Sequence, residues 1–284
     1  MKRKFYKYQG AGNDFLIADN RDGSIVLSTE RIAALCDRRY GIGADGLMLL
    51  ESADAPYDFR MTYYNSDGSG GMMCGNGGRC IVAFAADRGI GSYSFVAADG
   101  PHTAEILAAD GCAKTVRLQM KDVCSYERHE SLTGTDVPSD GYFLDTGTRH
   151  FVRIVDGVDS YDVVGEGRDI RYNAAELQPV GANVNFIEPA EDGILKVRTY
   201  EKGVEDETYA CGTGIVASCL AAFVAGISPS EVLSDGHVRY DVQAKRDSLS
   251  VDFRPADACQ GLAEEVYLTG PAVFVAEVIL SDAR

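Results

Sequence analysis

The sequence is organised around the stretch Met72-Met73-Cys74-Gly75-Asn76-Gly77-Gly78-Arg79-Cys80, which has a counterpart in Tyr209-Ala210-Cys211-Gly212-Thr213-Gly214. In both stretches Cys-Gly-x-Gly leads directly into an apolar segment, which predicts a helix that begins near the cysteine. Backbone N–H groups point outward at a helix start, where the helix dipole is positive. Such a setting lowers a cysteine thiol pKa from about 8.5 into a range of roughly 3.5–7.5. Cys74 and Cys211 are therefore candidate reactive thiols.

The composition is that of a folded globular protein. The chain has 284 residues, of which 45% are hydrophobic and 25% charged, enough for one large domain or two of medium size. Its net charge of −16 argues against nucleic acid as a partner, because phosphate binding needs a basic surface. A small anionic ligand would need local cations or N–H groups to overcome this overall field.

We expect a cytoplasmic protein with no membrane partner. The basic N-terminus, residues 1–8, is not followed by the apolar run of a signal peptide. The most apolar stretch, residues 215–227, is too short to span a bilayer and predicts a buried helix. In this setting reduced thiols are the default for the eight cysteines, and a disulfide framework is not expected.

Hydrophobic periodicity predicts alternating strands and helices. Ser28 is a predicted N-cap with Glu30 in the first turn of its helix, and a second helix covers residues 80–87. Polar or glycine-rich loops are expected at residues 9–15, 41–46, 66–71, 181–186 and 203–208. Strands are expected at residues 4–8, 15–18, 47–50, 58–65, 152–155, 195–201, 238–242, 249–253, 265–268 and 273–280, with others up to about residue 120.

The second half of the chain repeats the landmarks of the first. Asn13 and Thr148, each at a polar turn, are 135 residues apart; the strand ends Asn65 and Glu201 are 136 apart; the two cysteines are 137 apart. We therefore predict an α/β (α+β) fold of two similar domains related by pseudo-two-fold symmetry, with the active site in the cleft between them. The pattern weakens over residues 121–140, which places the division between residues 1–125 and 126–270.

A pair of thiols facing each other suits the inversion of an amino acid. The substrate α-carboxylate would accept N–H groups at Gly75-Asn76 and at Gly212-Thr213. One cysteine, as thiolate, would remove the Cα proton while the other, as thiol, would protonate the opposite face. This scheme requires no metal and no organic cofactor.

Other interpretations of the cysteines were weighed. Either one alone could be a buried structural thiol, Cys74 with Cys80 could bind a metal, or two facing thiols could form a redox pair. The spacing is not that of a zinc pair, and the recurrence at a fixed offset favours a shared reactive role. The cysteines expected to be structural are Cys36, Cys80, Cys112, Cys124, Cys219 and Cys259.

Taken together, the motifs resemble the diaminopimelate epimerase family, in the family's order and over about residues 5–275. The motifs that carry the resemblance are Gly10-Ala11-Gly12-Asn13-Asp14-Phe15, Gly41-Ile42-Gly43-Ala44-Asp45-Gly46, Asn65-Ser66-Asp67-Gly68-Ser69, Cys74 to Cys80, Tyr200-Glu201-Lys202-Gly203 and Ala210-Cys211-Gly212-Thr213-Gly214. The resemblance implies a pyridoxal-independent isomerase that interconverts L,L- and meso-diaminopimelate in lysine and peptidoglycan precursor synthesis. It also implies two similar domains, with a C-terminal strand at residues 271–284 that returns to the first.

The resemblance also implies roles for individual residues. Cys74 and Cys211 would be the base and acid, in agreement with the argument from the residues, and His150 would support the site. The substrate contacts that it implies or that lie at matching positions are Asn13, Asn65, Gly75, Asn76, Thr148, Asn183, Glu201, Lys202, Gly212 and Thr213.

The sequence departs from the family pattern at two places. The usual Gly-Asn/Ser-Pro-His reads Gly147-Thr148-Arg149-His150, and the usual Tyr-Glu-Arg-Gly reads Tyr200-Glu201-Lys202-Gly203. In the family these positions help to hold the distal end of the substrate, and lysine lacks the bidentate fork of arginine. Arg149 is a candidate for the missing guanidinium.

Two other functions stay open at this point: a related cofactor-independent racemase, acting on proline or hydroxyproline, and a diaminopimelate-binding thiol sensor without catalysis. The expected partner is a small amino-acid substrate, with a homodimer as the alternative to a monomer.

Overall fold

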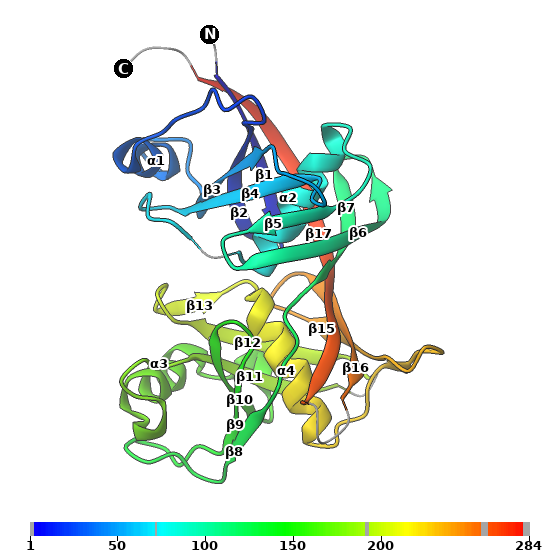
Figure 1. The fold of residues 1–284 in the computed structure, drawn as a ribbon. Helices are drawn as coiled ribbons and strands as arrows, with labels where there is room; N and C mark the ends of the chain where they lie inside the picture. Colours follow the sequence, from blue (N-terminus) through cyan, green and yellow to red (C-terminus); the bar gives the residue numbers. More distant parts are fainter. Residues whose placement is uncertain (1–2, 72, 191–192, 257–260, 281–284) are drawn as a thin grey trace. The chain divides into compact units, whose positions relative to one another are not determined.

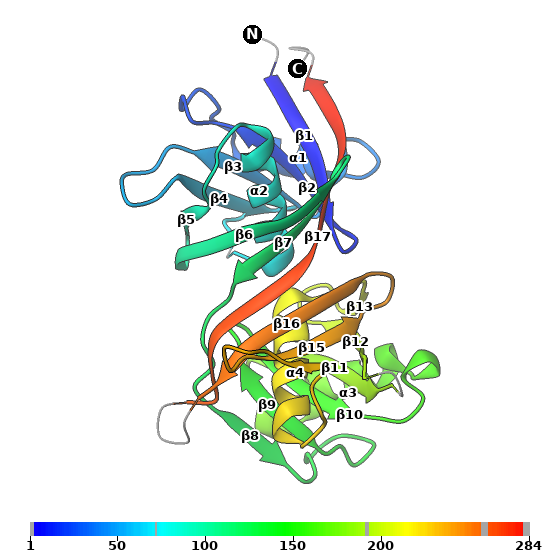
Figure 2. The ribbon, with the colours of Figure 1, turned by 90° about the vertical axis from the view of Figure 1, so that its right-hand side faces the viewer.

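The computed structural model describes residues 3–71, 73–190, 193–256 and 261–280. Contacts between Cα atoms divide the chain into two compact units. Unit 1 comprises Met1–Gln119 and Thr269–Arg284, and unit 2 comprises Met120–Leu268. Residues 120–125 thus belong to unit 2, and the end of the chain returns to unit 1. Figures 1 and 2 show the elements of each unit.

Unit 1 is a closed barrel of strands. They are β1 (Arg3–Gly10), β2 (Asn13–Asp19), β3 (Gly46–Glu51), β4 (Phe59–Asn65), β5 (Ser94–Ala97), β6 (Gly100–Asp110), β7 (Ala113–Gln119) and the second part of β17 (Ala263–Leu280). Each strand from β1 to β6 pairs with the next, and β17 pairs with both β7 and β1, which closes the ladder. The β2–β3 and β4–β5 pairs are parallel and the others antiparallel.

The barrel encloses helix α2 (Gly75–Asp87), whose residues from Gly75 to Ala85 are all buried. Strand alternation separates the inner face from the outer face. Leu16 and Leu47 belong to a cluster outside the barrel that buries α1 (Thr29–Cys36), for which Ser28 is the N-cap as predicted. Because the strands surround α2, most of this helix is shielded from solvent.

Strands β1 and β2 are joined by a turn of only two residues. Ala11 and Gly12 adopt φ values of 53° and 83°, and they connect the paired residues Gly10 and Asn13. Two central residues with positive φ match the right-handed twist of the flanking strands. Asn13 is thereby fixed at the first position of β2.

Unit 2 repeats this topology. Its elements are β8 (Tyr126–His129), β9 (Gly141–Asp145), β10 (Arg149–Ile154), α3 (Val163–Asn173), β11 (Asn183–Pro189), β12 (Leu195–Glu201), β13 (Asp206–Thr208), α4 (Gly212–Val224), β14 (Glu231–Val232), β15 (Val238–Gln243), β16 (Ser248–Pro255) and the first part of β17, with short 3-10 turns at Val158–Ser160 and Ala175–Leu177. The β10–β11 and β12–β15 pairs are parallel, like β2–β3 and β4–β5. Helices α3 and α4 follow β10 and β12 respectively, as α1 and α2 follow β2 and β4.

Residue pairing between corresponding strands shows which positions of the two units are equivalent. Phe15 pairs with Gly46 in unit 1, and His150 pairs with Asn183 in unit 2. Met48 pairs with Tyr63, and Asn185 pairs with Thr199. The two units therefore have matching backbones on which different side chains stand.

Several predicted elements differ from the structure. Residues 183–186, predicted as loop, begin strand β11, and the predicted helix 80–87 already begins at Gly75. The predicted strands 265–268 and 273–280 form one strand, β17. Periodicity did not predict α3, β8 or β13, because α3 contains two glycines and has few apolar residues, and the two strands are short. Met72 and Cys259 lie outside the described residues.

We predict that Gly167→Ala destabilises unit 2. A Cβ atom added at Gly167 on α3 would lie 2.5 Å from the Cβ of Tyr200, a fully buried residue on β12. Overpacking of this kind costs roughly 1–3 kcal/mol, more than the helix propensity that alanine adds. Chemical denaturation measures the change in the free energy of unfolding.

Gly91→Ala is the matched control, since a Cβ atom there meets nothing within 4 Å. Its effect should stay within about 0.5 kcal/mol. Equal effects of the two substitutions would contradict the packing of α3 on β12.

Candidate functional site

Cys74 is the N-cap residue of α2. Its backbone is extended, with φ −116° and ψ 150°, and its Sγ accepts a hydrogen bond from the backbone N–H of Gly77 at 3.2 Å. A Cβ atom at Gly77 would lie 3.2 Å from this sulfur, so glycine leaves room for the contact. The prediction that the first cysteine stands at a helix start is confirmed.

Cys211 is the N-cap residue of α4 in unit 2, but its sulfur has a different neighbour. Its Sγ lies 3.5 Å from the hydroxyl oxygen of Thr213, and no backbone N–H caps onto its side chain. The Thr213 hydroxyl lies 3.0 Å from Nε2 of His150 and 3.1 Å from the hydroxyl of Thr148. The second thiol therefore adjoins side-chain hydroxyl groups.

A chain of hydrogen bonds runs from β12 to this sulfur. The Thr199 hydroxyl donates to Oδ1 of Asn185 at 2.9 Å, and the Asn185 amide nitrogen lies 3.1 Å from Nδ1 of His150. Since that nitrogen can only donate, Nδ1 of His150 accepts and Nε2 carries the proton. Nε2–H then donates toward Thr148 and Thr213, so the Thr213 hydroxyl can donate to Cys211.

His150 is neutral in this chain. The side chain is fully buried, and burial lowers its pKa to about 3. A proton on Nδ1 would also displace the hydrogen bond from Asn185. The cost of burying a charge thus keeps the ring neutral, and the hydrogen bond from Asn185 selects its tautomer.

Unit 1 carries apolar side chains at the equivalent positions. Phe15 stands where unit 2 has His150, and Met48 stands where it has Asn185. A Cβ atom at Gly77 would lie 3.4 Å from the Met48 sulfur, whereas one at Gly214 would lie 2.4 Å from Oδ1 of Asn185. The two thiols are therefore alike in backbone position and different in chemical surroundings.

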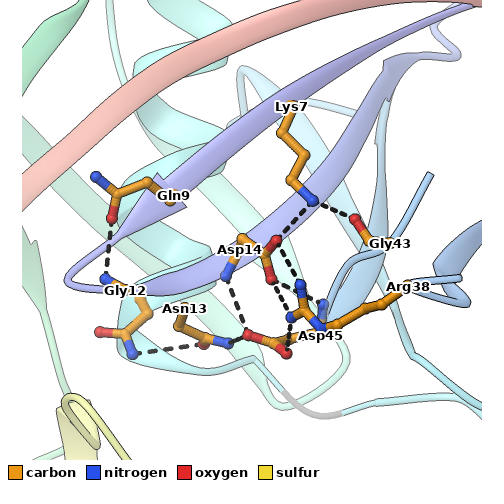
Figure 3. A network of polar contacts seen from close by, with 9 residues as sticks. Lys7, Gln9, Gly12, Asn13, Asp14, Arg38, Gly43 and Asp45 are labelled. Atoms are coloured by element: carbon orange, nitrogen blue, oxygen red, sulfur yellow. Dashed lines mark hydrogen bonds and ion pairs between the residues drawn. The ribbon is translucent and has the colours of Figure 1, made fainter.

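The polar contacts of unit 1 lie instead around Asn13 and Asn76 (Figure 3). Nδ2 of Asn13 donates to the Asp45 carboxylate at 2.6 Å, and Nδ2 of Asn76 donates to Oδ1 of Asn13 over a long 3.4 Å. Oδ1 of Asn76 accepts from the guanidinium of Arg79 at 2.9 Å. Arg79 is fully buried and also donates to the Gly75 and Pro271 carbonyl oxygens.

A second carboxylate braces this network. Arg38 bridges Asp14 and Asp45, with 2.6 Å contacts to both, and Lys7 pairs with Asp14 at 2.6 Å and donates to the Gly43 carbonyl. Burial tends to raise the pKa of Asp14, but Arg38 and Lys7 outweigh it and hold this pKa at about 2. Asp14 therefore stays ionised and keeps both cations in place.

The other predicted site residues of unit 1 and unit 2 lie at strand ends. Asn65 ends β4, where its amide donates to the Ser69 hydroxyl at 3.0 Å. Asn183 begins β11, with its Oδ1 accepting the backbone N–H of Lys202 at 2.9 Å. Glu201 ends β12 and accepts from the Thr208 hydroxyl at 2.8 Å.

Within unit 2, Lys202 lies among cations. Its pKa is lowered by burial and by the nearby charges of Arg171 and Arg149. Arg149 donates to the Leu177 carbonyl oxygen at 3.1 Å, and its guanidinium stands 4.9 Å from the centre of the Phe143 ring. Arg171 approaches the Glu205 carboxylate at 3.7 Å. Two guanidinium groups therefore flank Lys202, from β10 and from α3.

The remaining cysteines fall into two groups. Cys36, Cys80 and Cys219 are buried, and burial raises the thiol pKa of each, to about 11 for Cys36. Cys112 and Cys124, expected to be structural, are exposed. Among the described residues, no group of three or more His, Cys, Asp or Glu side chains could hold a metal ion, and no helix is long and apolar enough to cross a membrane.

Sequence reasoning did not single out Asn185, Thr199, Asp45 or Arg79. One signal was available for Asn185: asparagines at positions 183 and 185 share one face if the segment is a strand. The segment was interpreted as a loop, which hides that alternation.

We predict that His150→Gln flattens the pH dependence of stability. A histidine whose folded pKa lies near 3 and whose unfolded pKa lies near 6.5 makes the unfolded state bind more protons, so stability falls as pH drops below 6.5. This loss is about 2 kcal/mol between pH 7 and pH 5. Denaturation of both proteins at the two pH values measures it.

The wild-type protein, denatured in parallel at pH 7 and pH 5, is the reference. An unchanged loss in His150→Gln would contradict the neutral, buried state of this residue.

Solved structures with the same fold have low sequence identity to this chain. A phenazine biosynthesis protein from Bacillus anthracis superposes with a TM-score of 0.73 at 15% identity, over 99% of each chain. A probable proline racemase from Agrobacterium radiobacter superposes with a TM-score of 0.68 at 16% identity, over 99% of this chain and 93% of that one.

Sequence relatives are much closer. The chain is 41% identical to a diaminopimelate epimerase of Flavobacterium psychrophilum, over 98% of this chain and 100% of that protein. It is 42% identical to one of Chlorobaculum tepidum, over 93% of this chain and 95% of that protein. The family model described as diaminopimelate epimerase matches residues 5–123 and 142–275. With its N-cap cysteines in two units of one topology, the chain thus belongs to the diaminopimelate epimerase family.

Proposed function

We propose that this protein is an isomerase that interconverts L,L- and meso-diaminopimelate by moving the Cα proton. The observation that carries the proposal is the pair of N-cap cysteines, one on each of two helices that occupy equivalent positions in two units. Membership of the diaminopimelate epimerase family supports this substrate over other amino acids. The reaction would serve lysine and peptidoglycan precursor synthesis.

In the proposed mechanism, Cys74 and Cys211 act on opposite faces of one carbon atom. The substrate α-carboxylate accepts N–H groups at the two helix starts, where Gly75-Asn76 and Gly212-Thr213 stand. One thiolate takes the Cα proton and becomes a thiol, and the other thiol gives its proton to the opposite face and becomes a thiolate. The reverse reaction exchanges the two roles, and the protein ends with one proton moved between its sulfurs.

In this proposal the helix starts stabilise the negative charge that develops on the substrate. Helix starts supply oriented N–H groups, which strengthen as hydrogen-bond donors when charge grows on the carboxylate. Asn13, Asn65 and Asn183 provide further neutral contacts to the substrate in this proposal. Glu201 contacts the substrate amino group at the reacting carbon. Thr148 and His150 hold the hydroxyl of Thr213 beside Cys211.

The distal end of the substrate carries a second amino and carboxyl group. We assign its carboxylate to Lys202, because this lysine joins Arg171 and Arg149 in the cationic part of an otherwise acidic protein. Arg149 contacts Leu177 and Phe143, and Arg171 contacts Glu205 and Tyr172, so both guanidinium groups are candidates to replace the family's usual arginine.

The expected setting is the cytoplasm, where reduced thiols persist. A homodimer is the alternative to a monomer, and the molar mass in solution decides between them.

We predict that Cys74→Ala and Cys211→Ala each abolish epimerisation. Every turnover needs one base and one acid, each typically worth roughly 10²–10⁴-fold. The measurement is proton exchange at Cα in deuterated water with L,L-diaminopimelate and no added cofactor. Normal epimerisation by both single variants would refute the two-thiol mechanism.

Parallel assays with L-proline and trans-4-hydroxy-L-proline test the related racemase function. Exchange with either of these, and none with diaminopimelate, would overturn the assigned substrate. Cys219→Ala is the control variant, since this thiol is fully buried within α4.

We predict that Lys202→Ala raises KM for diaminopimelate by roughly tenfold or more and lowers kcat much less, because a charged hydrogen bond contributes about 1.5–3 kcal/mol. Lys202→Arg should retain binding. Lys196→Ala is the control, because this half-buried lysine of β12 pairs with Asp159 instead. An unchanged KM in Lys202→Ala would contradict the assignment of the distal carboxylate.

A further inference from the structure

Unit 1 contains a line of hydrogen bonds that begins at a buried cation and ends at an anion. Arg79 donates to Oδ1 of Asn76 at 2.9 Å, Nδ2 of Asn76 donates to Oδ1 of Asn13 at 3.4 Å, and Nδ2 of Asn13 donates to the Asp45 carboxylate at 2.6 Å. Each donor points the same way along the line. Figure 3 shows the Asn13 amide next to the Asp45 carboxylate.

The charges at the two ends determine which way both amides face. If Asn13 were turned by half a rotation, its carbonyl oxygen would face the Asp45 carboxylate, and two acceptors would meet. A turned Asn76 would likewise place an N–H₂ group against the Arg79 guanidinium. Amide orientation here follows from the positions of a cation and an anion, and each amide confirms the other's orientation.

Several groups hold Asp45 in place. One carboxylate oxygen accepts both the Asn13 amide and, at 3.1 Å, the backbone N–H of Asp14. The other accepts the Arg38 guanidinium at 2.6 Å. Its backbone N–H donates to the Asp14 carbonyl oxygen at 2.8 Å. Asp45 therefore has little freedom to follow Asn13, and Asn13 must follow Asp45.

We propose that Asp45 is a positioning residue, which acts through Asn13 by fixing the direction in which that amide presents its remaining N–H to the substrate. This inference rests on the proposed function, in which Asn13 contacts diaminopimelate. Among the described residues, Asp45 is the acceptor of the Asn13 amide. The second hydrogen on Nδ2 of Asn13 can then donate to a substrate carboxylate, in a direction that the Asp45 contact determines.

The line of hydrogen bonds also passes the start of α2, next to the thiol of Cys74. Asn76 is the second residue of α2, directly after Gly75 and the N-cap Cys74. Arg79 stands on the same helix and holds both the Gly75 carbonyl oxygen and the Asn76 amide. The same contacts that orient the Asn13 amide therefore also hold the helix start against the β1–β2 turn.

A double-mutant cycle tests the proposal. Asp45→Asn replaces the acceptor by an amide of the same shape and should lower kcat/KM for L,L-diaminopimelate by roughly tenfold or more, mainly through KM, since a charge-assisted hydrogen bond is lost. In the Asn13→Ala background the same substitution should change kcat/KM less than about twofold, because the residue it acts through is gone. Equal factors in the two backgrounds would overturn the proposal.

Glu51→Gln is the matched control. Glu51 stands at the other end of β3, where its carboxylate accepts the side-chain amide of Asn20 at 2.8 Å and the hydroxyl of Thr62 at 2.7 Å. Glu51→Gln removes a carboxylate–asparagine contact of the same kind at the opposite end of β3 from Asp45, and kcat/KM should stay within about twofold. A loss as large as that of Asp45→Asn would mean that the effect is one of stability alone, and would overturn the proposal.

A second measurement does not depend on activity. In the ligand-free protein, the Asn13 side-chain amide protons, assigned by their disappearance in Asn13→Ala, should move in Asp45→Asn and stay in place in Glu51→Gln. Asp45→Ser serves in the same way if Asp45→Asn does not fold. Unmoved Asn13 resonances would overturn the proposal, whereas absence of epimerisation by the wild-type protein would reject the proposed function and leave this test intact.

Discussion

The structure depends on hydrogen-bond partners for the N–H groups at the start of a helix that strands enclose. Four N–H groups at the N-terminus of any helix have no partner inside the helix, and burial makes each unpaired group costly. In α2 a cysteine sulfur accepts one of these groups, that of Gly77. The N-cap position thus brings a thiol to the end of the barrel. Glycine at position 77 leaves room for the Cys74 sulfur, whereas glycine at position 214 leaves room for Oδ1 of Asn185.

Two units with one topology provide two such helix starts, but they surround the thiols differently. In unit 2 a hydrogen-bonded chain of Asn185, neutral His150 and Thr213 leads to Cys211. At the positions of Asn185 and His150, unit 1 has the apolar residues Met48 and Phe15. A buried polar chain stabilises a fold only when every member is satisfied. The repeat therefore preserves the backbone while each unit solves its own packing, and the two sulfurs need not titrate alike.

In unit 1, charged side chains in direct contact with two neutral amides determine how these amides face. Asn13 and Asn76 are amides without charge, yet Asp45 and Arg79 determine how they face. An amide held in this way can bind a carboxylate without bringing a full cation to it.

The sequence by itself determined the cysteine pair, the helix starts, the repeat and the family, because these are local patterns that recur at a constant offset. It also predicted that His150 belongs with the site, through a motif. Only the tertiary structure decided that residue 150 is a buried neutral donor, that Arg149 is committed to Leu177 and Phe143, and that Asp45 faces Asn13. These contacts join residues of different elements. Strand register and loop conformation decide which side chains meet, and the hydrophobic periodicity of a single segment does not contain that information.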